Sequence, residues 1–162
     1  MNGSLRLRHF SSIFIFDDNK VLLLHKYVPF VNREFWLPSA GGHFEKDEMN
    51  DPDACLWREV AEEIGLTPAD LTDVELRYIS SRFDSGEMRY NYYYFGKLAP
   101  RVSRDLVNNE GELRWFDFDE SRGLEMLPST RVCLCHYLDE GRHTSHLYYA
   151  VCSNEVRIIR LD

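Results

Sequence analysis

The sequence predicts a mixed α/β fold in a single domain. Its 162 residues suit one hydrophobic core, because domains cluster at about 100–150 residues. Hydrophobic residues make up 44% of the chain and aromatic residues 14%, which is enough apolar surface for a packed interior. No linker or repeat interrupts the chain, and strand-like stretches are interleaved with two helical ones without a strict β-α-β alternation.

Apolar and aromatic runs bounded by turn residues predict the strands. In chain order these are Ser11–Phe16, Val21–His25, Phe35–Pro38, Val74–Ser80, Met88–Leu98, Leu113–Phe118, Leu147–Val151 and Val156–Leu161. The first two flank a turn at residues 17–20, and the last two are expected to close a hairpin around residues 153–155. The aromatic residues between Tyr90 and Phe95 are expected to pack the sheet.

Capping residues delimit two helices. The first covers Ala54 to Ile64, with Asp51 as a plausible N-cap, Pro52 at the first helical position and Gly65 at the end. The second is predicted from Pro128 to Leu138 and ends near Gly141.

The charge and the cysteines restrict the function. The chain has 27 acidic and 19 basic residues, a net charge of −8, which argues against binding to nucleic acid or to an anionic membrane. A small anionic substrate stays compatible if a metal ion supplies positive charge. The four cysteines form no C-x-x-C pair, which favours reduced thiols in a cytoplasmic protein over a disulfide or zinc site. No apolar run reaches the length of a membrane helix.

Three carboxylates share one side of the first helix. At about 100° per residue, Glu59, Glu62 and Glu63 fall within an arc of about 100°. Such charges repel one another and lie near the helix C-terminus, where the macrodipole disfavours them. A hard divalent cation would offset both effects, whereas the alternative is a solvated acidic face. The adjoining arc should face the core, and it carries Leu56, Trp57, Val60, Ala61 and Ile64.

This segment resembles the Nudix (MutT-like) hydrolase superfamily, whose signature is G-x5-E-x7-R-E-U-x-E-E-x-G-U, with U bulky and aliphatic. The named positions are filled by Gly42, Glu48, Arg58, Glu59, Val60, Glu62, Glu63, Gly65 and Leu66. The lead-in at Trp36–Pro38 and Gly41 is also common in the family. The chain departs from the signature in one respect, because nine residues rather than seven separate Glu48 from Arg58. A loop before the helix can absorb the two extra residues, but the placement of Glu48 stays open.

The resemblance implies an α/β/α sandwich around a mixed sheet, with residues 1–162 as one Nudix domain and the motif at 42–66. It also implies Mg²⁺-dependent, or Mn²⁺-dependent, hydrolysis of a pyrophosphate linkage in a nucleoside diphosphate derivative by a metal-activated water. The expected metal ligands are the Gly42 carbonyl, Glu48, Glu59, Glu62 and Glu63, with Arg58 orienting a glutamate. The general base is expected at Glu110 or Glu112, or at a glutamate of the helix itself.

The substrate is less well defined by the sequence. Phe35, Trp36, Tyr78 and Phe83 are candidates for stacking on a base, although each also suits the core. Residues 81–84 carry neither the proline typical of ADP-ribose hydrolases nor the tyrosine typical of diadenosine polyphosphate hydrolases, which favours nucleoside triphosphates, including oxidised ones. Hydrolysis of ADP-sugars or dinucleoside polyphosphates is an alternative, as is a non-catalytic nucleotide sensor, although sensors usually lose the motif glutamates. The oligomeric state stays open, with a homodimer as one alternative.

Overall fold

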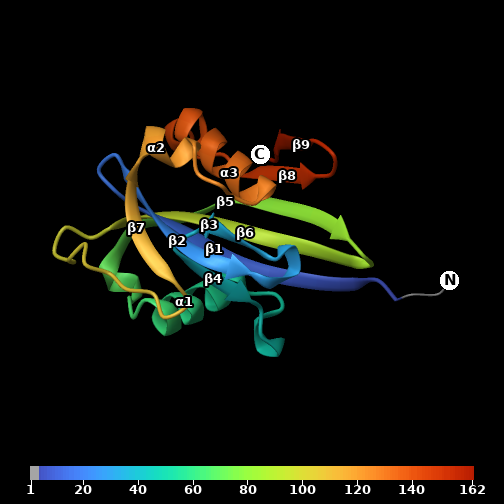
Figure 1. Cartoon of the computed structure of the whole chain (residues 1–162), viewed down its shortest axis with the longest axis horizontal. Helices are drawn as coiled ribbons and strands as arrows, with labels where there is room; N and C mark the ends of the chain where they lie inside the picture. The colour runs from blue at the N-terminus through green and yellow to red at the C-terminus, as the bar shows by residue number, and fades with distance from the viewer. Residues whose placement is uncertain (1–3) are drawn as a thin grey trace.

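The structure, a computed structural model, describes residues 4–162. A mixed β-sheet forms the middle layer, with α1 on one face and α2 and α3 on the other (Figure 1). The strands are β1 (Arg6–Asp17), β2 (Lys20–Val28), β3 (Arg33–Leu37), β4 (Ala40–His43), β5 (Leu71–Asp84), β6 (Glu87–Leu98), β7 (Glu112–Asp117), β8 (Tyr148–Cys152) and β9 (Val156–Arg160). The helices are α1 (Pro52–Glu63), α2 (Phe118–Arg122) and α3 (Pro128–Asp139), with short 3-10 helices η1 (Pro29–Val31), η2 (Lys46–Glu48), η3 (Pro68–Asp70) and η4 (Gly141–His143). The predicted α/β/α arrangement is therefore confirmed.

The long strand β1 lies near the middle of the sheet, whose order is β3-β2-β1-β6-β5-β8-β9. β1 pairs parallel with β6 along Arg6–Phe16, and β5 pairs parallel with β8, while the other pairs are antiparallel. On its second edge, β1 first pairs with β4 over Phe10–Ile13 and then with β2 over Ile15–Asp17. β2 therefore separates from β1 at the point where β4 takes its place, and this divergence makes room for a cleft.

Alternating side chains of β1 supply the two cores of the molecule. Ile13 and Ile15 are fully buried in a cluster with Leu56 and Val60 of α1. Phe14 and Phe16 belong to the opposite cluster, in which α3 contributes Cys133, Leu134 and Leu138. Because strand side chains alternate with a period of two, one strand can anchor a helix on each face of the sheet.

Helix α1 begins as the sequence predicts. The Asp51 Oδ1 atom accepts a hydrogen bond from the Ala54 amide at 3.0 Å, which satisfies one of the free donors at the helix start. The helix ends before Gly65, which adopts the left-handed conformation with φ of +77°. One core expectation is wrong: Ala61 is exposed, because the buried stripe of this helix is narrower than the predicted arc and consists of Cys55, Leu56 and Val60.

Two elements were not predicted from the sequence. Residues 40–43 form β4 although glycine disfavours strands, because β1 offers them a free edge to pair with. The predicted strand Leu113–Phe118 ends at Asp117, and Phe118 begins α2. The cause is a capping box, in which Asp117 and Glu120 each accept the other's backbone N–H and so start a helix.

All four cysteines lie within the described residues, and none of them forms a disulfide. Burial raises the pKa of Cys55 to about 11, so its thiol stays protonated at neutral pH. Between residues 4 and 162, every helix is too short or too polar to cross a membrane.

Replacing Phe14 by alanine tests the core on the α3 side. Phe14 is fully buried and stacks on Phe95 with ring centroids 5.1 Å apart, so Phe14→Ala should lower the free energy of unfolding by about 4 kcal/mol. Phe83 is 61% exposed, and the matched change Phe83→Ala should cost about 0.5 kcal/mol or less. Urea unfolding of both variants measures the difference, and equal losses would contradict this packing.

Candidate active site

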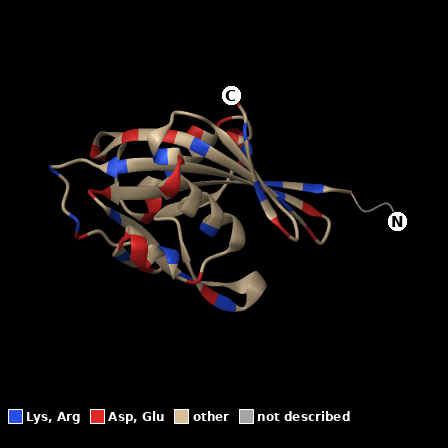
Figure 2. Cartoon of the chain, turned by 90° about the horizontal axis from the view of Figure 1, so that it is seen from above, with Lys and Arg blue, Asp and Glu red and all other residues tan. Residues whose placement is uncertain are grey.

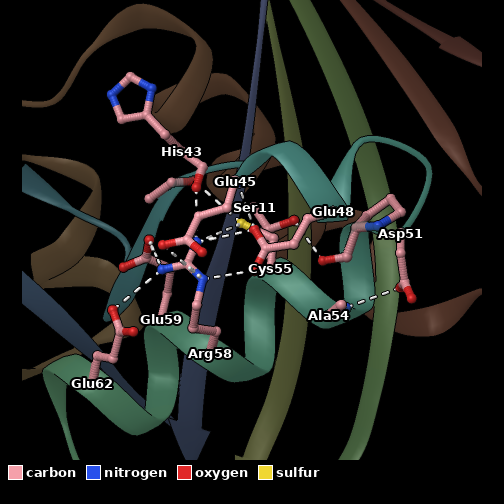
Figure 3. A network of polar contacts seen from close by, with 12 residues as sticks. Ser11, His43, Glu45, Glu48, Asp51, Ala54, Cys55, Arg58, Glu59 and Glu62 are labelled. Atoms are coloured by element: carbon pink, nitrogen blue, oxygen red, sulfur yellow. Dashed lines mark hydrogen bonds and ion pairs between the residues drawn. The ribbon is translucent and has the colours of Figure 1, made fainter.

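Arg58 lies at the centre of a network that joins α1 to the loop before it (Figure 3). Its Nε atom donates to Glu48 Oε1 at 2.6 Å and its Nη2 atom to Glu48 Oε2 at 3.0 Å. The Nη1 atom donates to Glu59 at 2.8 Å and to Glu62 at 3.2 Å. Nη2 also donates to the His43 carbonyl at 2.9 Å. One guanidinium thus connects three motif glutamates with β4.

Glu48 is committed to this network. Its side chain is buried, and besides Arg58 it accepts the Glu45 amide at 2.8 Å, so both of its oxygens have partners. The hydrogen bonds from Arg58 are the main reason why the pKa of Glu48 falls to about 2. The chain between η2 and α1 is a turn at residues 49–50 followed by the Asp51 cap, and this turn absorbs the extra length of the motif.

Glu59 lies directly against the backbone of Gly42. A Cβ atom added at Gly42 would come within 2.3 Å of Glu59 Oε1, closer than nonbonded atoms approach. A side chain at residue 42 would therefore displace the Glu59 carboxylate from the position it holds beside the backbone. This contact places the Glu59 carboxylate beside Gly41 and Gly42 of β4, the glycine loop of this site.

Glu63 approaches the same loop from the last turn of α1. Its Oε2 atom accepts hydrogen bonds from Asn108 Nδ2 at 3.0 Å and from the Gly41 amide at 3.3 Å. Burial raises the pKa of Glu63, the Asn108 hydrogen bond counteracts this, and the nearby Glu59 charge raises it further. Asn108 is itself buried and also donates to the Ser39 carbonyl at 3.2 Å. Asn108 was not predicted from the sequence because only ionisable groups were considered, although Glu110, two residues further on, was predicted.

The loop at residues 108–111 distinguishes the two candidates for the general base. Asn109 binds the α1 carbonyls of Glu62 and Glu63, which holds the loop against the end of the helix. Glu110 lies 2.9 Å from Lys26 Nζ, and Lys26 lines the cleft described below. Glu112 instead pairs with Arg114 at 2.7 Å on the exposed side of β7. The structure therefore brings Glu110 toward the carboxylates and leaves Glu112 outside.

A cleft of about 290 Å³ opens where β2 has separated from β1. Gly41, Gly42 and Glu63 line one part of it, and Lys26 and Phe30 line another. Phe10, Asn91 and Tyr93 contribute side chains from the sheet. The Glu63 carboxylate thus shares a cavity with basic and aromatic groups, and the cavity volume approaches the lower end of small-molecule sites.

The structure places none of the four predicted stacking residues in this cleft, and Tyr78 is fully buried in the core. Phe35 is buried in β3, and Trp36 packs edge-on against Phe116 with centroids 4.6 Å apart. Phe83 is exposed on the face of β5 opposite to Arg82, which does line the cleft. The reason is side-chain alternation, which the sequence alone cannot assign to a face when both faces carry aromatic residues. The aromatic lining comes instead from Phe10, Tyr27, Phe30 and Tyr93.

The oxygen atoms around Gly41 and Gly42 suit a hydrated hard cation. Within residues 4–162, no three acidic, histidine or cysteine side chains converge as a ready metal cage. Glu59 and Glu63 nevertheless meet at the Gly41–Gly42 backbone, and Glu63 Oε1 has no hydrogen-bond partner there. Two carboxylates and the Gly42 carbonyl, whose contact with the Cys55 thiol is long at 3.6 Å, suit Mg²⁺, which retains several waters and takes its other ligands from phosphates.

Comparison with known proteins identifies the family. The family model described as NUDIX domain matches residues 6–136. The chain belongs to the Nudix family. Its members act on nucleoside diphosphate derivatives, and the protein is a Nudix pyrophosphohydrolase. No curated protein sequence matches the chain.

Solved Nudix structures share the fold over most of the chain. A mutator MutT protein from Bacillus halodurans is 25% identical with a TM-score of 0.67, and the match covers 93% of this chain and 97% of that one. A C. elegans Ap4A hydrolase is 17% identical with a TM-score of 0.67, over 85% of this chain and 99% of that one. A NUDIX hydrolase from Nitrosomonas europaea is 18% identical with a TM-score of 0.67, over 91% and 79%.

Because of the Glu48–Arg58 pair, the free energy of unfolding of this Nudix domain should fall at acid pH. Because the folded-state pKa of Glu48 is depressed to about 2, its contribution is complete above about pH 4.5 and is lost as pH falls toward 2. Glu48→Gln should lower the free energy of unfolding by about 2 kcal/mol at pH 7 and by less at pH 3. Urea unfolding at both pH values measures this, with Glu155→Gln, an exposed position, as the control. A loss independent of pH would contradict the assignment.

Proposed function

We propose that the protein hydrolyses the pyrophosphate linkage of a nucleoside triphosphate, including oxidised forms, with Mg²⁺ as the preferred ion and Mn²⁺ as a substitute. The observation that carries the proposal is the pair Glu59 and Glu63, which lie at the Gly41–Gly42 backbone, with Glu63 lining the cleft. Likeness to a mutator MutT protein supports the choice of triphosphates, as does the lack of the other substrate markers at residues 81–84.

In this proposal Glu59, Glu63 and the Gly42 carbonyl hold the metal, and Glu62 adds an outer oxygen at the exposed edge. The bound ion supplies charge neutralisation for the phosphates and lowers the pKa of a bound water. Glu63 reaches the site with one oxygen fixed by Asn108 and the Gly41 amide, which leaves the other free for a ligand. The two extra residues of the motif leave this part of the helix unchanged.

We assign Arg58 and Glu48 to positioning rather than to ligation. Arg58 orients Glu59 through a 2.8 Å hydrogen bond, as the resemblance implied. Glu48 was also expected as a metal ligand, but both of its oxygens are engaged by Arg58 and the Glu45 amide. Releasing it would leave the Arg58 charge partly unpaired in a half-buried position, which is costly. We therefore propose that Glu48 acts through Arg58.

Glu110 is our candidate for the general base. It is tethered by Lys26, which lies in the cleft, and its backbone amide binds the Asn108 side chain at 2.7 Å. A base must come within hydrogen-bond reach of the proton it removes, and ion pairs of this kind often rearrange when substrate binds. Lys26 would then be free to contact a substrate phosphate.

Other aspects of the proposal follow the sequence expectations. We take residues 1–162 as one domain acting on a small nucleotide in the cytoplasm, without nucleic-acid or membrane partners. Dinucleoside polyphosphates, ADP-sugars and a non-catalytic sensor are the competing assignments, and a homodimer is an alternative to a monomer. The C. elegans Ap4A hydrolase supports only the fold, because it is 17% identical.

An activity screen tests the proposal. Nucleoside triphosphates, oxidised nucleotides, ADP-ribose and dinucleoside polyphosphates are incubated with Mg²⁺ or Mn²⁺, and the nucleotide product and the remaining substrate are quantified by chromatography. Triphosphates should be cleaved best, and Glu63→Gln should reduce kcat at least about 100-fold, because it removes a metal-binding charge. Glu155→Gln should change kcat less than about twofold, since Glu155 is exposed on the β8–β9 turn. No cleavage of any compound, or cleavage unaffected by Glu63→Gln, would contradict the proposal.

A further inference from the structure

Three arginines stand in register on neighbouring strands of the sheet. Arg8 of β1 lies opposite Arg89 of β6, and Arg89 lies opposite Arg82 of β5. Residues directly opposite in a sheet point to the same face, and this face is the one that carries Tyr78 and Tyr93. Arg82 and Arg89 line the cleft, whereas Arg8 donates to the His43 ring at 2.9 Å at its border.

Such an arrangement needs an explanation, because like charges directly opposite each other in a sheet destabilise it. Acidic residues lie close by at the end of the sheet where the chain begins (Figure 2). Glu87 contacts Arg89 at 2.8 Å and Arg8 at 3.4 Å, and Asp84 lies 3.9 Å from Arg82. These contacts leave three guanidinium groups with two carboxylates, both of which belong to the hairpin tip rather than to the cleft.

Phe30 of η1 fixes where the guanidinium groups lie. The Arg89 guanidinium carbon is 4.8 Å from the centre of the Phe30 ring, and that of Arg82 is 5.3 Å away. A planar guanidinium stacked on an aromatic ring keeps its N–H donors free at its edge. Arg89 Nε and Nη2 already donate to Glu87 Oε1 at 3.2 and 2.8 Å, whereas Arg82 has a single 3.9 Å ion pair, with Asp84, among the described residues. Phe30 therefore holds two guanidinium groups together at the mouth of the cleft, where a bound anion would take the place of Glu87 at Arg89.

The cleft has an opposite charge balance to the whole protein. Among the lysine, arginine, aspartate and glutamate side chains that line it, three are basic (Lys26, Arg82 and Arg89) and one is acidic (Glu63), whereas the chain carries a net charge of −8. The negative group belongs to the glycine-loop part, while Arg82 and Arg89 come from the sheet near the β5–β6 tip. The substrate cavity thus has one part suited to a cation and another suited to an anion.

We propose that Arg82 and Arg89 bind a second anionic group of the substrate, a phosphate, away from the pyrophosphate linkage that is cleaved. The inference rests on the proposed function, because it takes the carboxylate part of the cleft as the place of the pyrophosphate. Phosphate fits best because two guanidinium groups can donate to separate oxygens of one dianion. The phosphate has two chemical sources, a phosphorylated sugar hydroxyl or the far end of the phosphate chain.

Calorimetric binding in EDTA tests this without metal and without turnover. The probes are adenosine 5′-monophosphate, adenosine 3′,5′-bisphosphate and adenosine 5′-diphosphate, titrated into the full chain. At least one of the two probes that carry two phosphates should bind about tenfold or more tightly than the monophosphate. A gain for the 3′,5′-bisphosphate assigns the sugar source, and a gain for the diphosphate assigns the chain source.

The variant Arg82→Gln/Arg89→Gln should lose the gain, so that all three probes bind with equal affinity. The control Arg101→Gln/Arg157→Gln removes the same charge from exposed positions outside the cleft and should keep the gain. Arg82→Gln alone, whose one ion pair is 3.9 Å long, serves if the double variant unfolds, and it should reduce the gain at least threefold.

The proposal is overturned if neither probe gains over the monophosphate, or if the gain survives in the cleft variants. Failure of the hydrolysis screen is a separate result, because these titrations need neither metal nor catalysis. A gain without hydrolysis would leave the arginine site standing and remove the enzyme assignment. Hydrolysis without a gain in affinity would keep the enzyme assignment and remove the arginine site.

Discussion

The bidentate pairing of Arg58 with Glu48 is the interaction on which the rest of the site depends. It joins the loop after β4 to helix α1, and the same guanidinium reaches Glu59 and the His43 carbonyl. Because Glu48 is buried and Arg58 is its main charge partner, neither can leave without exposing the other to a large desolvation cost. The pair therefore fixes the distance between the glycine loop and the carboxylates of the helix.

Negative and positive side chains occupy different parts of the site. Glu59 and Glu63 concentrate negative charge at the Gly42 backbone, where an oxygen-ligated cation fits. Lys26, Arg82 and Arg89 give the remainder of the cleft the opposite sign. A molecule with separated phosphates would be recognised twice, once through the metal and once directly by arginines. The net negative charge of the chain thus agrees with the carboxylate part of the site and gives no indication of the basic part.

The sequence predicted what depends on local pattern. The Asp51 cap, the course of α1 and the motif glutamates follow from spacing along one helix, and the structure has them there. Asn108, Phe30 and the Arg8–Arg89–Arg82 row depend on which strands pair and in which register, which periodicity cannot determine. Phe83 and Arg82 are adjacent in sequence, yet only Arg82 faces the cleft. The stacking prediction for Phe83 therefore failed because neighbouring residues of a strand point to opposite faces of the sheet.

The central claim is that Glu59 and Glu63 hold the metal while Glu48 holds Arg58. Crystals soaked in Mn²⁺ and measured at an anomalous wavelength test it most directly. The account predicts an anomalous peak ligated by Glu59, Glu63 and the Gly42 carbonyl, with Glu48 still paired to Arg58. A peak ligated by Glu48, with Arg58 displaced from it, would contradict the account.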